Sequence, residues 1–356
     1  MIGAGSATNV RVISVPKVLN VGRRNLGQVA SILRRADFPL GRVLVLSGNG
    51  PTLALSETVT AGLSEAGAQT RHCFAGLPAR QTVNQLAREA EMFAADLIVG
   101  VGGGRVLDVA KSVAQACGID FVSVPTSISH DGISSPVSSL VDAGGIRGSV
   151  SATTPAAVII DIDVIEGAPL TTLRSGVGDL LSNLSAIEDW QLADARGKED
   201  YDAYSALIAD GAARPLLSLE GLARRGAAET LARGLILSGL AMATAGTSRP
   251  CSGAEHLISH ALDHLLGPDA RSHGAQVALG TLIATTARGF SPPGLHAAYY
   301  RFGLPLRPAD LGLSMQLMTD AVLLARQTRP NRYTILDEMD LDKSTAADLV
   351  RRAFPS

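Results

Sequence analysis

Three consecutive glycines, Gly102 to Gly104, separate two apolar patterns of different period. Residues 97–101 before them form a short, β-branched apolar run that is typical of a buried strand. After them, apolar residues recur at helical spacing as far as Val113, and a second apolar run ends at Pro125. The stretch 94–139 therefore predicts a β-α-β unit. Its strand-to-helix turn lacks side chains, so the free N–H groups and positive end of the helix can receive a phosphate group.

Polar residues crowd the end of the second strand of this unit. Residues 126–132 read TSISHDG, and open parallel sheets bind ligands beyond the carboxyl ends of their strands. Each feature also has a plainer explanation, because three glycines can form a simple tight connection and Ser and Asp are common in turns. The glycine spacing also differs from the G-x-G-x-x-G dinucleotide fingerprint. Taken together, the glycines and the polar loop favour a ligand site at this edge of the sheet.

Strand and helix patterns alternate through the first half of the chain and then give way to helices alone. The other expected strands are 11–21, interrupted at Pro16, 42–46, 69–74, 119–124 and 156–162, with helices at 25–33, 52–66 and 82–94. Beyond residue 165 the patterns are helical, at 174–194, 201–212, 214–223, 226–245, 254–266, 274–289, 308–312, 313–326 and 344–353. The alternation predicts a mostly parallel sheet covered on both faces. We therefore expect an α/β domain, residues 1–165, and an all-α domain, residues 166–356.

Composition excludes several classes of function. The chain has 356 residues, a net charge of −2 and three cysteines, none in a CxxC pair. This charge gives no attraction for nucleic acid or an anionic membrane, and the cysteines indicate no disulfide framework. No apolar run approaches the roughly 18 residues that span a bilayer, and the N-terminus lacks the apolar core of a signal peptide. We expect a cytoplasmic protein that acts on small molecules.

Four of the seven histidines lie between residues 256 and 273. His256, His260 and His264 are four residues apart and so share one helix face, and His273 begins the next helical segment. Two histidines from successive helices and one carboxylate would form a three-ligand site with an open position, which suits catalytic zinc or iron(II). A helix whose histidines are hydrogen-bonded or partly exposed is the alternative.

Spacing alone does not identify the carboxylate ligand. The candidates in the helical half are Asp179, Glu188, Asp189, Glu255 and Asp263. Asp179 lies in the segment SGVGDLLSN, whose leucines indicate a core helix, and a buried carboxylate needs a partner. A helix cap or a salt bridge would provide that partner as well as a metal would.

Six segments, in chain order, carry a resemblance to a known family. They are GVGGGRVLDVAK, VPTSISHDGISSP, SGVGDLLSN, SGAEHLISHALD, HGAQVALGT and NRYTILDE. They resemble the sn-glycerol-1-phosphate dehydrogenase family, in the iron-containing alcohol dehydrogenase and dehydroquinate synthase-like superfamily, and the resemblance extends over about residues 12–340. It implies a dehydroquinate synthase-like fold, in which a Rossmann-like N-terminal domain binds NAD(P), a helical domain holds a metal, and the active site lies between them.

The resemblance also implies roles for individual residues. The family's metal ligands match Asp179, His256 and His273, which selects one of the five carboxylates. Its substrate-contacting positions match Asp131 and His260, whereas His264 falls outside the matched set. Its cofactor-binding positions match Gly102, Gly103, Gly104, Arg105, Val106, Thr126, Ser127, Ser129 and Ser135.

The implied activity is the interconversion of dihydroxyacetone phosphate and sn-glycerol 1-phosphate with NADPH or NADH. The divalent metal, Zn²⁺ first with Fe²⁺ or Ni²⁺ as alternatives, would act as a Lewis acid on the substrate oxygen. Because no carboxylate follows the second strand at residues 47–49 to repel a 2′-phosphate, we expect NADPH to be accepted. The family also implies a homo-oligomer, by analogy alone.

Substrate identity is the least constrained part of this interpretation. Departures from the family pattern at Cys251 and Ala275, beside the matched ligands, leave open a related polyol phosphate or another alcohol. A sugar-phosphate cyclase of the dehydroquinate synthase type shares the architecture, but its group carries a longer, lysine-bearing loop and usually a Glu as first metal ligand. A non-catalytic nucleotide-binding relative would have lost metal ligands, and all three positions are intact here.

Overall fold

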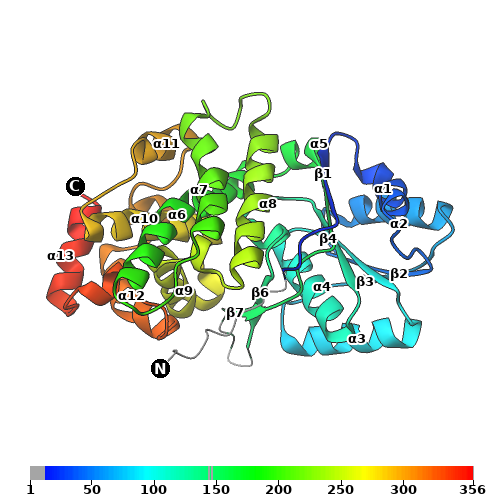
Figure 1. Cartoon of the computed structure of the whole chain (residues 1–356), viewed down its shortest axis with the longest axis horizontal. Helices are drawn as coiled ribbons and strands as arrows, with labels where there is room; N and C mark the ends of the chain where they lie inside the picture. The colour runs from blue at the N-terminus through cyan, green and yellow to red at the C-terminus, as the bar shows by residue number, and fades with distance from the viewer. Residues whose placement is uncertain (1–12, 143–144, 146, 356) are drawn as a thin grey trace, which may run out of the picture.

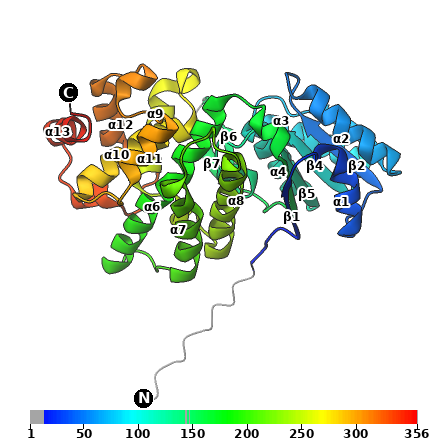
Figure 2. The same ribbon diagram turned by 90° about the horizontal axis from the view of Figure 1, so that it is seen from above.

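The computed structural model describes residues 13–142, 145 and 147–355. A sheet with its covering helices forms one half of the molecule, and a bundle of helices forms the other (Figure 1). Seen from above, the two halves again lie next to each other along the long axis, with α13 at the outer end of the bundle (Figure 2). The predicted fold, an α/β half followed by a helical half, is confirmed. The domain boundary at residue 165 stays a prediction.

Six parallel strands form the sheet, in the spatial order β1-β8-β5-β4-β2-β3. The strands are β1 (Val18–Gly22), β2 (Arg42–Ser47), β3 (Gln69–Phe74), β4 (Leu97–Gly102), β5 (Asp120–Pro125) and β8 (Ala157–Asp161). Five of them agree with the expected strands to within one residue at each end. The first is shorter than expected because it begins only after Pro16, and residues 11 and 12 lie outside the described part of the chain.

Neighbouring residues along each strand pack into different cores, because successive side chains point to opposite faces. The helices that cover the sheet are α1 (Val29–Arg35), α2 (Leu53–Glu65), α3 (Arg80–Phe93) and α4 (Gly104–Cys117). Val43 and Val45 of β2 join the core beneath α1 and α2. Leu44 and Leu46 join the core with α3 and α4. Coverage on both faces explains why these strands are continuous apolar runs in the sequence.

The carboxyl ends of β4 and β5 lie beside each other, with Gly102 in register with Pro125. The glycine turn and the polar loop therefore leave the sheet at the same edge. A 3.0 Å hydrogen bond from the N–H of Thr126 to the carbonyl of Gly102 continues the pairing into the loop. A Cβ atom on Gly102 would lie 2.6 Å from Cβ of Val106, so a side chain here would block the turn into α4.

An antiparallel hairpin after this loop was not predicted. Strands β6 (Val137–Val141) and β7 (Arg147–Ser151) pair with each other apart from the main sheet. Their sequences, VSSLV and RGSVS, are rich in Ser and Gly, which have low strand propensity. Pairing along the backbone, rather than burial of an apolar face, defines this hairpin. The expectation that 156–162 is the only strand after β5 was therefore wrong, because β6 and β7 lie between them.

Helices alone make up the rest of the described chain. They are α5 (Ile162–Glu166), α6 (Leu170–Ala195), α7 (Ala203–Ser218), α8 (Ala227–Ala245), α9 (Ala254–Leu266), α10 (His273–Arg288), α11 (Leu295–Phe302), α12 (Met315–Thr328) and α13 (Lys343–Ala353). Helix α6 lies at the centre of the bundle, packed against α7, α8, α9 and α10. None of the helices in the described residues is both long and apolar enough to cross a membrane.

Two helical expectations were inaccurate. Residues 201–212 and 214–223 were expected as separate helices, but α7 is continuous and ends at Ser218. Pro215 lies in its last turn, where the proline removes only one hydrogen bond and does not break the helix. Helix α11 was not expected, because its eight residues are a weak periodic pattern.

Candidate active site

A cavity of about 1010 Å³ extends from the glycine turn of the sheet half to helices α9 and α10. Most of the candidate residues line it: Gly103, Gly104, Arg105, Val106, Thr126, Ser127, Ser129, Asp131, Ser135, His256, His260 and His273. Gly102 lies in β4 beneath the turn, and Asp179 reaches the site from α6 with only 3% of its surface exposed. His264 is exposed and does not line the cavity.

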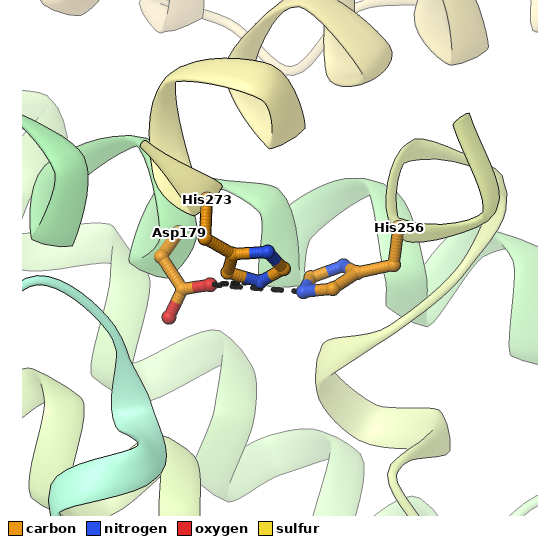
Figure 3. Close-up of side chains that lie close together, drawn as sticks. All are labelled: Asp179, His256 and His273. Carbon is orange, nitrogen blue, oxygen red and sulfur yellow. Dashed lines mark ion pairs between the residues drawn. The ribbon is translucent and has the colours of Figure 1, made fainter. Parts of the chain in front are cut away.

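Asp179, His256 and His273 converge from α6, α9 and α10 (Figure 3). Oδ1 of Asp179 lies 3.4 Å from Nε2 of His273 and 3.6 Å from Nε2 of His256. One ligand atom from each side chain lies within 4.8 Å of the other two. A carboxylate oxygen and two imidazole nitrogens in this arrangement fit a divalent metal with an open position for substrate.

Small residues bring these helices together. A Cβ atom on Gly178, next to Asp179, would lie 2.3 Å from the carbonyl oxygen of Gly274 at the start of α10. Oγ of Ser175 accepts a 3.0 Å hydrogen bond from the N–H of Gly274 and donates another of 3.0 Å to the carbonyl of Ser129. Helix α6 therefore holds both the helix of His273 and the polar loop after β5.

The other carboxylates considered from the sequence have different partners. Asp189 accepts hydrogen bonds of 2.7 Å from the N–H of Ala254 and from Arg288. Asp263 accepts a 2.9 Å hydrogen bond from the side-chain amide of Gln276. Asp179 is thus the carboxylate that lies between two histidines, a placement that residue spacing did not reveal.

Glu255 supports His256 from the side away from Asp179. Its Oε1 lies 3.0 Å from Nδ1 of His256, and its side chain is fully buried. A proton held on Nδ1 by this carboxylate leaves the lone pair of Nε2 for a metal, and such carboxylate–histidine pairs orient metal ligands. The structure thus adds Glu255 to the site in a role that its sequence position did not indicate.

Asp179 and His256 carry opposite charges in the metal-free protein. Burial alone would lower the pKa of His256, but contacts with Asp179 and Glu255 raise it to about 9. Burial likewise opposes ionisation of Asp179, yet the two histidines outweigh burial and hold the pKa of its carboxyl well below its usual range. The carboxylate is therefore charged and ready to bind a cation, whereas His256 must release a proton first.

Asp131 and His260 adjoin this group. The backbone N–H of Asp131 donates a 2.9 Å hydrogen bond to Asp179, and its carboxylate accepts one of 2.9 Å from Oγ of Ser238. Burial and the charge of Asp179 raise the pKa of Asp131 to about 7. The ring centre of His260 lies 6.3 Å from that of His273. Burial, followed by the charge of Arg329, holds the pKa of His260 well below its usual range, so this imidazole is neutral near pH 7.

His130 was not among the residues selected from the sequence, yet it lies between the glycine turn and the metal ligands. Its ring centre is 6.0 Å from that of His273, and a Cβ atom on Gly104 would lie 2.3 Å from its Nε2. Its Nδ1 accepts a 3.0 Å hydrogen bond from the N–H of Gly132. His130 is one of several polar residues in the TSISHDG loop, and no periodic signal shows which of them turn inward.

Lys111 of α4 holds the TSISHDG loop and the residues after it in place. Its Nζ, fully buried in α4, donates hydrogen bonds to the carbonyls of Gly132, Ser135 and Val137 at 2.8, 2.9 and 2.7 Å. Burial lowers the pKa of Lys111. The helix that starts at the glycine turn therefore also fixes the loop that carries Asp131.

The glycine turn has the features of a diphosphate cradle. The N–H groups of Val106 and Leu107 bond to the carbonyl of Gly103, and the first N–H groups of α4 have no intrahelical acceptor. A Cβ atom on Gly103 would lie 3.0 Å from Oγ of Ser127, so a side chain here would narrow the space above the helix N-terminus. The cavity continues along residues 48–52, which contain no acidic side chain.

Comparison with known proteins agrees with this geometry. Residues 20–169 match the family model described as iron-containing alcohol dehydrogenase. A glycerol-1-phosphate dehydrogenase [NAD(P)+] of Hyperthermus butylicus is 42% identical over 75% of this chain and 77% of its own length. One of Cenarchaeum symbiosum is 36% identical over 95% of each chain.

Solved structures share the fold at lower identity. A probable glycerol dehydrogenase from Sinorhizobium meliloti superposes with a TM-score of 0.78 at 23% identity, covering 96% of this chain and 98% of that chain. A maleylacetate reductase from Agrobacterium tumefaciens gives 0.71 at 19% identity, covering 98% and 99%. The fold is thus shared by enzymes named for different reactions, whereas both sequence relatives carry the same name. The chain belongs to the glycerol-1-phosphate dehydrogenase family, within the iron-containing alcohol dehydrogenases.

Proposed function

We propose that the protein is a metal-dependent NAD(P)H dehydrogenase that interconverts dihydroxyacetone phosphate and sn-glycerol 1-phosphate. One observation carries the proposal: a single cavity joins a glycine turn that suits a dinucleotide to Asp179, His256 and His273, which suit a metal. The names of the relatives supply the substrate. A related polyol phosphate remains the nearest alternative substrate.

Asp179, His256 and His273 would hold one divalent metal, for which we propose Zn²⁺ before Fe²⁺ or Ni²⁺. When bound, the metal supplies a Lewis acid for the substrate oxygen, and the nicotinamide supplies or accepts the hydride. The protein's own contribution is orientation. Glu255 fixes the tautomer of His256, and the loop from Thr126 to Ser135 lines the cavity together with the glycine turn and the two histidines.

The cofactor would lie along the glycine turn, with its diphosphate at the N-terminus of α4. Gly102, Gly103, Gly104, Arg105, Val106, Thr126, Ser127, Ser129 and Ser135 form the proposed cofactor site. Residues 48–52 at the far end of the cavity carry no negative charge to repel a 2′-phosphate. We therefore propose that NADPH is accepted as well as NADH.

Asp131 and His260 would move the proton that accompanies hydride transfer. Both line the cavity beside the metal-binding side chains. In the reductive direction, the new alcohol oxygen takes a proton from the carboxyl of Asp131, whose pKa of about 7 keeps part of it protonated, directly or relayed through a water held by the neutral His260. We further propose that the enzyme acts in the cytoplasm as a homo-oligomer, which rests on the sequence and on analogy with the family.

A screen for NADPH oxidation tests the proposal. The purified protein, loaded with Zn²⁺, is incubated with dihydroxyacetone phosphate, other keto-phosphates and unphosphorylated ketones. We expect stoichiometric NADPH oxidation with dihydroxyacetone phosphate and sn-glycerol 1-phosphate as the product. Turnover without net cofactor consumption would instead indicate a cyclase. No response to dihydroxyacetone phosphate would remove the proposed substrate and leave the family assignment as a statement about fold.

A further inference from the structure

Ser238 of α8 lies behind the cavity and contacts a carboxylate that lines it. Its Oγ donates a 2.9 Å hydrogen bond to Oδ2 of Asp131. Ser238 is itself fully buried and does not line the cavity, so it cannot touch a bound substrate directly. Oδ1 of Asp131 accepts no hydrogen bond from the described residues, which leaves this second oxygen available to a ligand.

Helix α8 is fixed against the loop that carries Asp131. Oγ of Ser134 in this loop lies 3.1 and 3.2 Å from two main-chain carbonyl oxygens of α8, to which it donates. A Cβ atom on Gly239 would lie 2.7 Å from the backbone nitrogen of Ser135, so a side chain there would push the helix and the loop apart. These contacts determine the distance between the hydroxyl of Ser238 and the carboxylate of Asp131.

The hydrogen bonds around Ser238 leave its hydroxyl proton one strong acceptor. Nδ2 of Asn183 donates to the carbonyl of Ala209 and to Oγ of Ser238, each at 3.2 Å. Sγ of Cys251 lies 3.1 Å from the same Oγ, but sulfur is a weak acceptor, and Oδ1 of Asn183 is 3.4 Å away. Because a carboxylate oxygen at 2.9 Å is the strongest of these acceptors, the proton points to Asp131.

Cys251 holds Ser238 from a third segment of the helical half. Its thiol is 2% exposed and donates to the main-chain carbonyl of Ser238 at 3.3 Å. Burial raises the pKa of this thiol well above its usual range, so it stays a neutral donor. Asn183 lies in α6, Ser238 in α8 and Cys251 in the short 3-10 helix that precedes α9. Three segments thus converge on one buried serine whose hydroxyl reaches the cavity wall.

We propose that Ser238 is a positioning residue that holds the carboxylate of Asp131 in the orientation needed for proton transfer to the substrate. Asn183 and Cys251 hold Ser238 in turn. The backbone N–H of Asp131 is bound to Asp179, so the helical half fixes both the main chain and the carboxylate of this residue. A carboxylate that could rotate freely would spend less time within reach of the substrate oxygen. The part of Asp131 in proton transfer rests on the proposed function.

The variant Ser238→Ala removes the donor and keeps a residue that favours a helix, so the fold should be retained. We expect kcat for dihydroxyacetone phosphate to fall about 10- to 100-fold, as for one lost hydrogen bond to a charged group, with KM for NADPH and zinc content unchanged. Ser205→Ala is the matched control, since Ser205 is also fully buried and donates to a carboxylate, that of Asp202, at 3.0 Å, away from the cavity. An unchanged kcat in Ser238→Ala, or an equal loss in both variants, would overturn the proposal.

A double-mutant cycle with Asp131→Ala shows whether Ser238 acts through Asp131. Once the carboxylate is gone, there is nothing left for Ser238 to position, so adding Ser238→Ala should change the residual kcat by less than about twofold. A general structural contribution of Ser238 would instead lower kcat by the same factor in both backgrounds. Equal factors in the two backgrounds would therefore contradict the positioning role.

Crystal structures of the wild type and Ser238→Ala, both loaded with Zn²⁺ and NADPH, separate failure of this proposal from failure of the proposed function. We expect the carboxylate of Asp131 to occupy a different rotamer, or more than one, in the variant, with its backbone N–H still bound to Asp179. If the wild type does not reduce dihydroxyacetone phosphate but the carboxylate is displaced in the variant, the proposed substrate is wrong and the positioning role stands. A carboxylate that keeps its single orientation without the Ser238 hydroxyl would refute that role.

Discussion

The backbone N–H of Asp131 donates a 2.9 Å hydrogen bond to Oδ2 of Asp179, while Oδ1 of the same carboxylate lies 3.4 Å from His273 and 3.6 Å from His256. One carboxylate therefore connects the loop at the edge of the sheet with both histidines of the helical half. The position of the proposed metal relative to the proposed cofactor is determined by this carboxylate and its neighbours.

Asp179→Asn should weaken metal binding and leave the fold unchanged. The amide oxygen of Asn can still accept the hydrogen bond from Asp131, but the negative charge that attracts a cation is lost. We expect the Zn²⁺ affinity to fall at least about 100-fold, with activity falling in parallel, and the far-ultraviolet circular dichroism to stay the same. Metal content by plasma mass spectrometry checks the first point. Glu188→Gln, on the same helix, serves as control, and retained metal in Asp179→Asn would contradict the assignment.

Glu255→Gln should weaken metal binding more mildly. The neutral amide holds the Nδ1 proton of His256 less firmly, so the ring is a poorer and less well oriented ligand. We expect a loss of Zn²⁺ affinity of about 10- to 100-fold, measured by competition with a chromogenic chelator. An unchanged affinity would show that Glu255 only stabilises the start of α9, where it also accepts a hydrogen bond from Gly253.

Metal affinity should depend on pH in a defined direction. The pKa of His256 in the metal-free protein is about 9, so near pH 7 the imidazole carries a proton that a metal must displace. We expect Zn²⁺ affinity to rise about tenfold per pH unit between pH 7 and 8.5, with proton release seen by calorimetry in buffers of different ionisation enthalpy. A flat profile would show that His256 is already neutral.

Protonation of His256 stabilises the metal-free protein, although it opposes metal binding. Because the folded-state pKa of His256 is raised above 6.5, its contribution to the stability of the metal-free protein is fully present below about pH 6.5 and is lost as the pH approaches 9. Chemical denaturation of the metal-free protein at pH 6.5 and pH 9, repeated with His256→Asn, isolates this contribution. Loss of the pH-dependent difference in the variant is the expected result.

Gly104→Ala should impair cofactor binding and spare the metal. The added methyl group would lie 2.3 Å from Nε2 of His130, so that ring must move, and the space above the helix N-terminus shrinks. We expect KM for NADPH to rise about tenfold, as for one lost hydrogen bond to a charged group, with metal content unchanged. In the control Gly211→Ala, the methyl group meets nothing within 4 Å in α7, so stability should stay the same or rise by up to about 1 kcal/mol.

Lys111→Met should destabilise the protein. The substitution keeps the length of the side chain but leaves the carbonyls of Gly132, Ser135 and Val137 without their donor. Since each buried unsatisfied polar group costs about 1–3 kcal/mol, we expect the free energy of unfolding to fall by about 3 kcal/mol or more in urea titrations. Lys343→Met, at an exposed lysine, should change it by less than about 0.5 kcal/mol. Equal stability of the two variants would show that water replaces the ammonium group.

The internal strands β8, β5, β4 and β2 were predicted closely because burial on both faces makes each one a largely apolar run, as in Leu97 to Val101. The β6–β7 hairpin was missed because backbone pairing defines it and half of its strand residues are Ser or Gly. Local patterns therefore identified the elements with an apolar face and failed where the tertiary structure alone determines the conformation.

The residues of the candidate site were likewise identified only in part from the sequence. Histidine spacing predicted a metal-ligand set in this segment, but residues alone did not separate Asp179 from four other carboxylates, and the family resemblance made that selection. His130 has no distinctive spacing, because it is placed by contacts with Gly104 and His273, which lie in other segments of the chain. Glu255 was one of five candidate carboxylates, and its spacing did not show that it contacts Nδ1 of His256. Lys111 was noticeable only as a rare lysine in an arginine-rich chain, and its three carbonyl partners are visible only after folding.

Ser129 and Asp131 belong to the loop that leaves the sheet, yet Ser175 and Asp179 of α6 hold this loop through direct hydrogen bonds. The three proposed metal ligands all lie in the helical half, on α6, α9 and α10, so this loop is attached to the same half as the ligands. A movement of the sheet beyond the loop would leave the three proposed ligands in place. The proposed metal site would then stay assembled between turnovers, without being rebuilt for each substrate molecule.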